Sequence, residues 1–325
     1  MRIVLFANTD WYLWNFRRSL ALAARDAGYD VLLLSPPGEY GTRFGEVGLR
    51  WLPLAMNRRS LNPLREIGVL RRLVKLFQRE KPALVHGFTI KCAVYGSLAA
   101  RLARVPARIN AVAGMGYVFS SADVRARLLR PLVRGMLRFA LGGKRARLIL
   151  QNPDDVGLFK RSRLADVARV RLIRGSGVDC SRFVPRAAGR NRGEANELRV
   201  LLAARLLWDK GIREYIEAAR ALRAQGVMAK FLLAGSPDAG NPAAVPESAL
   251  REWAAEGILE WLGHVEDMAE LFRSVDIVVL PSYYREGLPK SLIEAAACGL
   301  PLVTCPLRQN SCRSDRTKTR GRDKG

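Results

Sequence analysis

Short apolar segments alternate with amphipathic helical patterns along most of the chain, and this alternation limits the possible folds more than any other feature. Strands that alternate with helices form parallel sheets with helices on both faces. A first series of predicted strands lies near Arg2–Ala7, Tyr29–Leu34, Trp51–Leu54, Ala83–His86, Ala107–Ala111 and Arg147–Leu150. A second series begins at Leu198. The chain is therefore predicted to be an α/β protein with doubly wound parallel sheets.

Two series of this kind in 325 residues indicate two Rossmann-like domains with a cleft between them. We expect the first domain over residues 1–185, a linker over residues 186–197 and the second domain over residues 198–307. The linker is polar, contains glycine and lacks an apolar period. Residues 308–325 are basic and carry no aliphatic or aromatic side chain, so we expect a disordered tail.

The segment VDIVVLPSYYREGLPKSLIEAAACGLPLVT predicts a strand over Val275–Leu280, a loop, and a helix over Leu288–Cys298. A helix that begins after the carboxyl end of a parallel strand offers backbone N–H groups and a positive dipole end to a phosphate. Gly287 permits close approach of a ligand, and Glu294 can accept hydrogen bonds from a ribose diol. A nucleotide-sugar fits both features. The alternative is an ordinary amphipathic helix whose glutamates face water.

Two basic residues flank an earlier loop, between a predicted strand over Leu198–Ala204 and a helix that opens near Gly211. Arg205 and Lys210 are spaced so that both can reach a departing diphosphate, whose charge a site without metal must neutralise with cationic side chains. Taken alone, the pair can equally be two solvated surface residues.

These two elements resemble the glycosyltransferase family 4 enzymes, which are retaining transferases of the GT-B fold. The chain matches their E-x7-E element with Glu286-GLPKSLI-Glu294 and their RLxxxKG element with Arg205 and Lys210. The resemblance implies that Glu286 lies beside the donor sugar, that Glu294 holds the ribose of a UDP-sugar, and that Arg205 and Lys210 act on the diphosphate. It also implies donor contacts from Gly287, Leu288, Lys290 and Gly177, the last within a G-x-GVD-xxxF segment in which Asp179 can be only a turn residue.

Three motifs of the first domain narrow the resemblance to bacterial transferases that build glycans or polysaccharide on undecaprenyl diphosphate, including N-acetylgalactosamine transferases. They are Phe16-Arg17, HGFTIK from His86 to Lys91, and GMGYVF from Gly114 to Phe119, each after a predicted strand. We expect His86 to orient the donor or acceptor sugar and Lys91 to meet the lipid diphosphate. The predicted acceptor-binding residues are Arg17, Lys91, Gly116 and Tyr117. The family has proline where this chain has Cys92, and His86 and Lys91 can also be structural or solvated.

The positive charge of the chain is concentrated in the first domain. Residues 1–189 carry a net charge of +22 out of +24, whereas residues 190–307 carry −3. A basic acceptor domain fits a lipid diphosphate on an anionic membrane surface. Residues 123–141 can place Leu128, Leu129, Leu132, Val133, Met136 and Phe139 on one apolar face flanked by arginines, either at the membrane interface or as a core helix, and Pro131 is expected to kink or break it. Nucleic acid is the alternative partner, but no zinc-finger, RNP or basic-zipper pattern is present.

The sequence lacks the motifs of several other classes of enzyme. The chain contains no Asp-x-Asp, no P-loop and no G-x-G-x-x-G, and it has two histidines, so neither a metal nor a cofactor is predicted. Five cysteines without a C-x-x-C pair fit a reducing cytosol. With no apolar run of transmembrane length and no signal peptide, we expect a cytoplasmic protein, peripheral on the inner face of the cytoplasmic membrane.

The sequence thus predicts a metal-independent retaining transferase that moves a sugar, expected to be a HexNAc, from a UDP-sugar to a lipid-linked acceptor in polysaccharide, lipopolysaccharide or glycan biosynthesis. After Thr304 the chain departs from the family pattern, and we expect a truncated second domain. The alternatives are an inactive remnant that binds only nucleotide or membrane, and a nucleotide-sugar epimerase.

Overall fold

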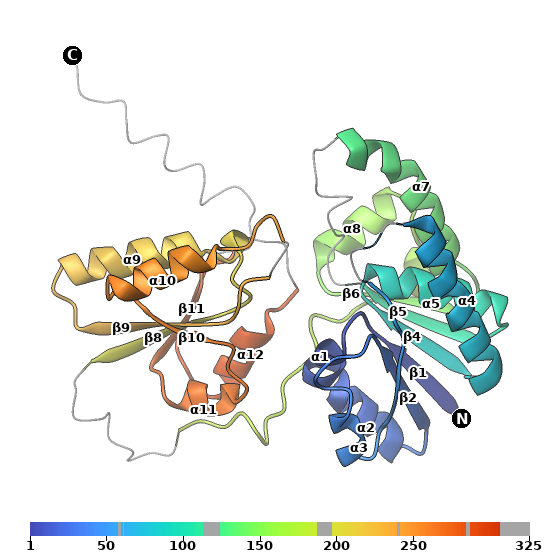
Figure 1. Cartoon of the computed structure of the whole chain (residues 1–325), viewed down its shortest axis with the longest axis horizontal. Coiled ribbons are helices and arrows are strands. Elements are labelled where there is room, and N and C mark those ends of the chain that lie inside the picture. Colours follow the sequence, from blue (N-terminus) through green and yellow to red (C-terminus); the bar gives the residue numbers. More distant parts are fainter. Residues whose placement is uncertain are drawn as a thin grey trace. The chain divides into compact units, whose positions relative to one another are not determined.

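The computed structural model describes residues 1–57, 60, 62–112, 124–186, 197–238, 241–283 and 287–305. The chain divides into two compact units, Met1–Ser176 and Gly177–Gly325, each built around one parallel sheet (Figure 1). The predicted α/β fold class is thus confirmed. The division falls ahead of the expected linker, whose residues 187–196 lie outside the described part of the chain.

The first unit contains a seven-stranded parallel sheet with the order β3-β2-β1-β4-β5-β6-β7. Its strands are β1 (Arg2–Phe6), β2 (Asp30–Ser35), β3 (Arg50–Pro53), β4 (Leu84–Phe88), β5 (Ala107–Val112), β6 (Ala146–Leu150) and β7 (Val170–Leu172). Val4 of the central strand β1 lies opposite Leu32 on one side and Val85 on the other, and all three are buried. The sequence patterns did not reveal β7, which has only three residues and is largely exposed.

Helices cover both faces of this sheet (Figure 1). They are α1 (Asp10–Tyr12), the π-helical turn η1 (Leu13–Arg17), α2 (Arg18–Asp26), α3 (Arg43–Glu46), α4 (Pro63–Glu80), α5 (Ile90–Leu102), α7 (Val124–Leu141), α8 (Pro153–Arg161) and the 3₁₀ turn η2 (Val167–Arg169). Helix α4 illustrates why such helices form and pack on the sheet. The Asn62 side chain caps its first turn, and Val69, Leu73 and Phe77, spaced four residues apart, are buried on one face.

Helix α7 continues through Pro131, so the proline does not break the helix, which was one of the two effects expected of it. Its core-facing residues include Leu137, with Ala140 and Leu141, whereas Met136 and Phe139 are exposed. Met136 and Phe139, two of the residues predicted to share one apolar face, therefore project away from the core. Within the described residues, no helix is long and apolar enough to cross a membrane.

The second unit contains a five-stranded parallel sheet with the order β10-β9-β8-β11-β12. Its strands are β8 (Leu198–Ala203), β9 (Ala229–Ala234), β10 (Glu260–Gly263), β11 (Ile277–Leu280) and β12 (Leu302–Thr304). Its helices are the 3₁₀ turn η3 (Trp208–Lys210), α9 (Ile212–Ala224), α10 (Glu247–Ala255), α11 (Met268–Arg273) and α12 (Lys290–Ala297). Apolar side chains from both faces of the sheet form its core.

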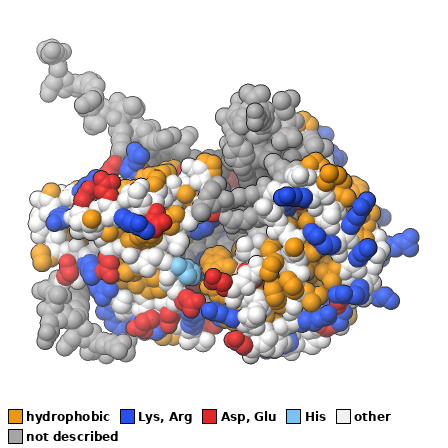
Figure 2. Space-filling view, in the orientation of Figure 1, with side chains coloured by type: hydrophobic (Ala, Val, Ile, Leu, Met, Phe, Trp, Pro, Cys, Tyr) orange, Lys and Arg blue, Asp and Glu red, His pale blue; other side chains and the backbone are white. Residues whose placement is uncertain are grey.

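The two units differ in their surface charge. On the face shown in Figure 2, Lys and Arg side chains spread over the first unit, while acidic and basic side chains are mixed over the second. This agrees with the net charges of the two halves of the sequence.

Candidate functional site

The strand order of the second unit creates a switch point between β8 and β11. The chain proceeds from β8 to β9 and β10 on one side and then returns to place β11 on the other side of β8. The loops after β8 and β11 therefore leave on opposite faces of the sheet at its carboxyl edge, which is the position where open α/β sheets bind ligands. These are the loops that carry the two sequence elements predicted to hold a nucleotide-sugar.

Backbone contacts hold these two loops together. The carbonyl oxygen of Asp209 accepts hydrogen bonds from the Tyr283 backbone N–H and the Ser282 hydroxyl, each at 3.2 Å. Gly211 begins α9 with a φ of +78°, and a Cβ added there would collide with the carbonyl oxygen of Pro281. The conformation and the close approach both require glycine at this position.

Replacing Gly211 with alanine is expected to destabilise the second unit by about 2 kcal/mol, because strain at positive φ adds to the collision with Pro281. Gly226 is the matched control, since it has a φ of +73° and open space where a Cβ would be added. Gly226→Ala should lower the free energy of unfolding by about 1 kcal/mol, because only the strain at positive φ applies there. Urea unfolding of both variants measures the difference, and equal losses would show that the contact between the loops contributes nothing.

Arg205 and Lys210 lie on the loop between β8 and α9, as predicted, but in different environments. The Arg205 side chain is 56% exposed and forms an ion pair with Asp238 at 3.6 Å. Lys210, at the end of η3, is only 6% exposed. Exposed ion pairs contribute at most about 1 kcal/mol, so an arriving diphosphate can replace Asp238 as the partner of Arg205.

Asp238 was missed by sequence reasoning, although one signal for it was present. It follows β9, the strand beside β8, and the carboxyl ends of adjacent parallel strands lie at the same edge of a sheet. Gly235 lies at the same edge of the sheet. Its φ is +140°, and its backbone lies so close to the Ala204 carbonyl oxygen that a Cβ would not fit.

Glu294 is 5% exposed and lies in the second turn of α12, where it forms an ion pair with Lys290 one turn earlier. The helix starts at Lys290, two residues later than predicted, after Pro289. Both residues had been predicted to contact the donor, and the structure adds that they contact each other. Gly287 and the half-exposed Leu288 precede this helix, whereas Glu286 lies outside the described residues.

The segment around Gly177 belongs to the second unit. Gly177 has a φ of +74°, and the Asp179 carboxylate accepts hydrogen bonds from the backbone N–H and hydroxyl of Ser181 at 3.0 and 2.6 Å. This is the turn role that the sequence left open for Asp179. Phe183 is buried in the core of the second unit and explains why the boundary lies before residue 177.

In the first unit the corresponding switch point lies between β1 and β4, and it holds Arg17 and His86. Arg17 ends the π-helical turn η1, donates a hydrogen bond to the Tyr12 hydroxyl at 2.8 Å, and lies 4.6 Å above the Phe88 ring. Single π-helical turns are frequent at functional sites. Sequence patterns do not reveal such a turn, and the participation of Tyr12 was missed.

His86 was expected to be the last residue of its strand, but β4 continues to Phe88 because Gly87 and Phe88 also pair with β5. The imidazole is buried, its Nε2 atom has no hydrogen-bond partner among the described residues, and its ring centre is 4.1 Å from that of Phe88. Burial, with a smaller contribution from the charge of Arg17, lowers its pKa from 6.5 to about 3. His86 is therefore neutral near pH 7 and can exchange hydrogen bonds with a sugar hydroxyl.

This depressed pKa predicts a pH dependence of stability. The unfolded state takes up the His86 proton near pH 6.5, whereas the folded state resists it down to about pH 3, so the free energy of unfolding should fall as the pH drops below 6.5. We expect a slope approaching about 1.4 kcal/mol per pH unit between pH 6 and pH 5. Urea unfolding should show that His86→Gln removes this slope, and an unchanged slope in the variant would contradict the assignment.

Lys91 is held by protein acceptors. Its ammonium donates to the carbonyl oxygens of Asn57 and Ser60 at 2.7 and 3.0 Å and to the Glu66 carboxylate at 2.8 Å. These contacts use all three N–H donors of a lysine. Cys92, where the family has proline, is a fully buried core thiol whose pKa burial raises to about 12. The predicted residues Gly116 and Tyr117 lie outside the described part of the chain.

Each of the two parallel sheets has a switch point at which ligands can bind, and the second unit carries the R-x4-K and E-x7-E elements. This combination is typical of glycosyltransferases of the GT-B type. A "Glycosyl transferase 4-like" family model matches residues 2–152, and a "Glycosyl transferases group 1" model matches residues 197–318. The two models together match most of the chain, so the chain carries two glycosyltransferase domains and is a glycosyltransferase. The second match extends past Thr304, where the sequence motifs placed the departure from the family.

Curated relatives and solved structures agree with this assignment. The chain is 28% identical over 311 residues to the Campylobacter jejuni N,N'-diacetylbacillosaminyl-diphospho-undecaprenol α-1,3-N-acetylgalactosaminyltransferase, covering 93% of this chain and 80% of that protein. It is 26% identical to an Escherichia coli UDP-Gal:α-D-GlcNAc-diphosphoundecaprenol α-1,3-galactosyltransferase, covering 78% of this chain and 65% of that protein. The fold is shared with Anabaena HepE crystallised with UDP-glucose, at 19% identity, a TM-score of 0.68, and coverage of 94% and 80%.

Proposed function

We propose that this transferase moves a sugar, a HexNAc, from a UDP-sugar to a sugar on a lipid-linked diphosphate, with retention of anomeric configuration and without a metal. The observation that carries the proposal is the match to the undecaprenol-linked N-acetylgalactosaminyltransferase over 93% of the chain. The pathway would be the biosynthesis of polysaccharide, lipopolysaccharide or another glycan, at the inner face of a membrane.

The donor site would lie at the switch point of the second unit, beside the loops after β8 and β11. A UDP diphosphate placed over the amino end of α12 gains the helix dipole and backbone N–H groups. Arg205 and Lys210, from the facing loop, supply two positive charges to the same group. Glu294 would accept hydrogen bonds from the ribose diol, with Lys290 holding its carboxylate in place.

The chemistry would take place on one face of the sugar. As the anomeric bond stretches, negative charge grows on the departing phosphate oxygen, where Arg205 and Lys210 stabilise it. That oxygen takes the proton of the acceptor hydroxyl, which attacks from the same side and preserves the configuration. Glu286 would hold sugar hydroxyls, and neutral His86, with Arg17, would orient the sugar bound by the first unit.

Two measurements test the proposal. Thermal melts with UDP, GDP and their sugars should give a rise in melting temperature with a UDP-sugar, because a ligand that binds only the native state stabilises it. Transfer to a synthetic lipid diphosphate-linked sugar should then proceed equally with and without EDTA. A chain that melts cooperatively but responds to no nucleotide-sugar, or transfer that EDTA abolishes, would contradict the corresponding part of the proposal.

A further inference from the structure

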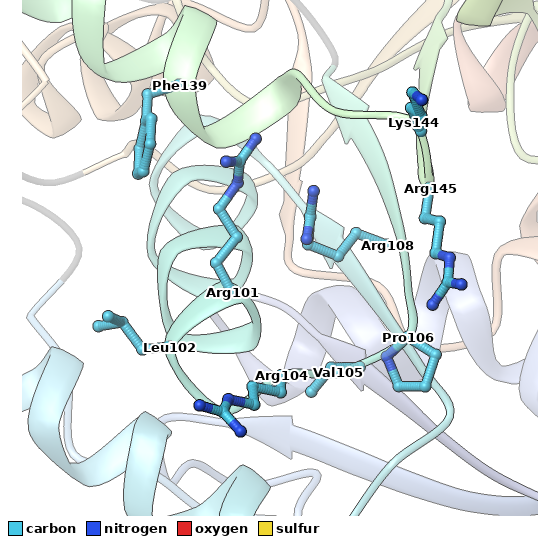
Figure 3. Close-up of a pocket in the computed structure, with 9 residues that line it drawn as sticks. All are labelled: Arg101, Leu102, Arg104, Val105, Pro106, Arg108, Phe139, Lys144 and Arg145. Atoms are coloured by element: carbon cyan, nitrogen blue, oxygen red, sulfur yellow. The ribbon is translucent and has the colours of Figure 1, made fainter.

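A basic pocket lies at the opposite edge of the first unit's sheet from Arg17 and His86. It has a volume of about 510 Å³ and lies where β5 and β6 begin, between the ends of α5 and α7 (Figure 3). Five of its lining side chains are cationic: Arg101, Arg104, Arg108, Lys144 and Arg145. No feature of the transfer reaction uses this pocket, which no sequence motif singled out.

Two guanidinium groups form its floor. Arg101 and Arg108 lie side by side in Figure 3, and both donate hydrogen bonds to the carbonyl oxygen of Gly142, at 2.5 and 3.1 Å. Their Nε atoms are buried and have no hydrogen-bond partner among the described residues. Arg108 is 8% exposed, and burial, together with the charge of Arg101, lowers its pKa. Two like charges held together in this way favour the entry of an anion.

No acidic side chain in the described part of the chain pairs with any of the five cations. Another arginine cluster of the same unit shows the contrast, because Arg2, Arg50 and Arg79 all surround the buried carboxylate of Glu80. An internal carboxylate neutralises that cluster. The basic pocket has no such group among the described residues, which is the arrangement expected of a site for an anionic ligand.

One side of the pocket's margin is apolar. Phe139 is 57% exposed, and the Arg101 guanidinium lies 4.4 Å from the centre of its ring. Leu102 is also exposed, as is Met136 one turn before Phe139 on α7. Exposed apolar side chains beside arginines are typical of surfaces that meet the headgroup region of a membrane.

We propose that the basic pocket binds a phosphate group, with Arg101 and Arg108 on its oxygens and Lys144 and Arg145 as a charged margin. Guanidinium groups suit this ligand because their paired N–H donors match phosphate oxygens. The phosphate belongs either to the headgroup of an acidic phospholipid, which the apolar side of the margin favours, or to a soluble phosphate ester. Phosphate binding in this pocket is proposed independently of the transfer reaction.

The first arm of the test is binding of the full chain to vesicles of phosphatidylcholine, with and without phosphatidylglycerol, measured by flotation. The pocket variant is Lys144→Glu with Arg145→Glu, two exposed residues. The control is Arg71→Glu with Lys75→Glu, the same change of charge on exposed residues of α4 outside the pocket. We expect the pocket variant to lose binding to the acidic vesicles at least about tenfold more than the control.

The second arm follows the melting temperature as inorganic phosphate is added to the same proteins. If the source is a soluble phosphate ester, the concentration for half of the shift should rise about tenfold in the pocket variant alone, while vesicle binding matches the control. Equal behaviour of the pocket variant and the control in both arms would overturn the proposal. Should the double variant fail to melt cooperatively, Lys144→Ala replaces it, and UDP-sugar melts report separately on the donor site.

Discussion

Replacing Arg205 or Lys210 with alanine should lower turnover at least about a hundredfold, which is the loss typical of removing one preorganised donor to a developing anion. Both residues lie on the loop after β8, at the switch point where the diphosphate is proposed to bind. The negative charge that they are proposed to stabilise grows as the anomeric bond breaks. The turnover number should therefore fall more than the affinity for the donor.

Two controls separate this role from a structural one. Arg213 is an exposed arginine at the start of α9, close to the same loop, whose guanidinium lies 5.4 Å from the Trp208 ring. Arg213→Ala should keep near-normal turnover. Lys210 is buried, so Lys210→Met, which keeps most of the side-chain volume, shows whether packing or charge is responsible. Near-normal turnover in Arg205→Ala or Lys210→Met would refute the assignment of that residue.

Glu294→Ala should weaken binding of UDP about a hundredfold. The buried carboxylate is proposed to accept hydrogen bonds from both ribose hydroxyls, and a hydrogen bond to a charged group contributes about 1.5–3 kcal/mol. Calorimetry with UDP and with its 2′-deoxy analogue isolates this contact. The unsubstituted protein should prefer UDP strongly, and the variant should discriminate little between them.

Lys290→Met is the matched control for Glu294. It removes the partner of the carboxylate but keeps the carboxylate itself, so the preference for UDP over the deoxy analogue should persist with reduced overall affinity. If Glu294→Ala retains the full preference for UDP, then Glu294 does not contact the ribose diol and its pairing with Lys290 is structural.

The sequence predicted the local units of the site well. Arg205 and Lys210 share one loop, and Lys290 and Glu294 share one helix, so their spacing along the chain determines their spacing in space. The boundaries were less accurate, as with the strand that was expected to end at His86 but continues to Phe88. Glycine is depleted in strands, so the local pattern ended at Gly87, whereas pairing with β5 carries the strand through it.

The sequence alone determined the alternation of strands and helices, and hence the two parallel sheets. It also contains the motifs from which a donor site after β8 and β11 is predicted. The tertiary structure decided which charges have partners. Lys91 meets Glu66, 25 residues away, whereas Arg101 and Arg108 converge on Gly142, 41 and 34 residues along the chain. Such distant contacts depend on how helices pack on the sheet, and no local pattern records them.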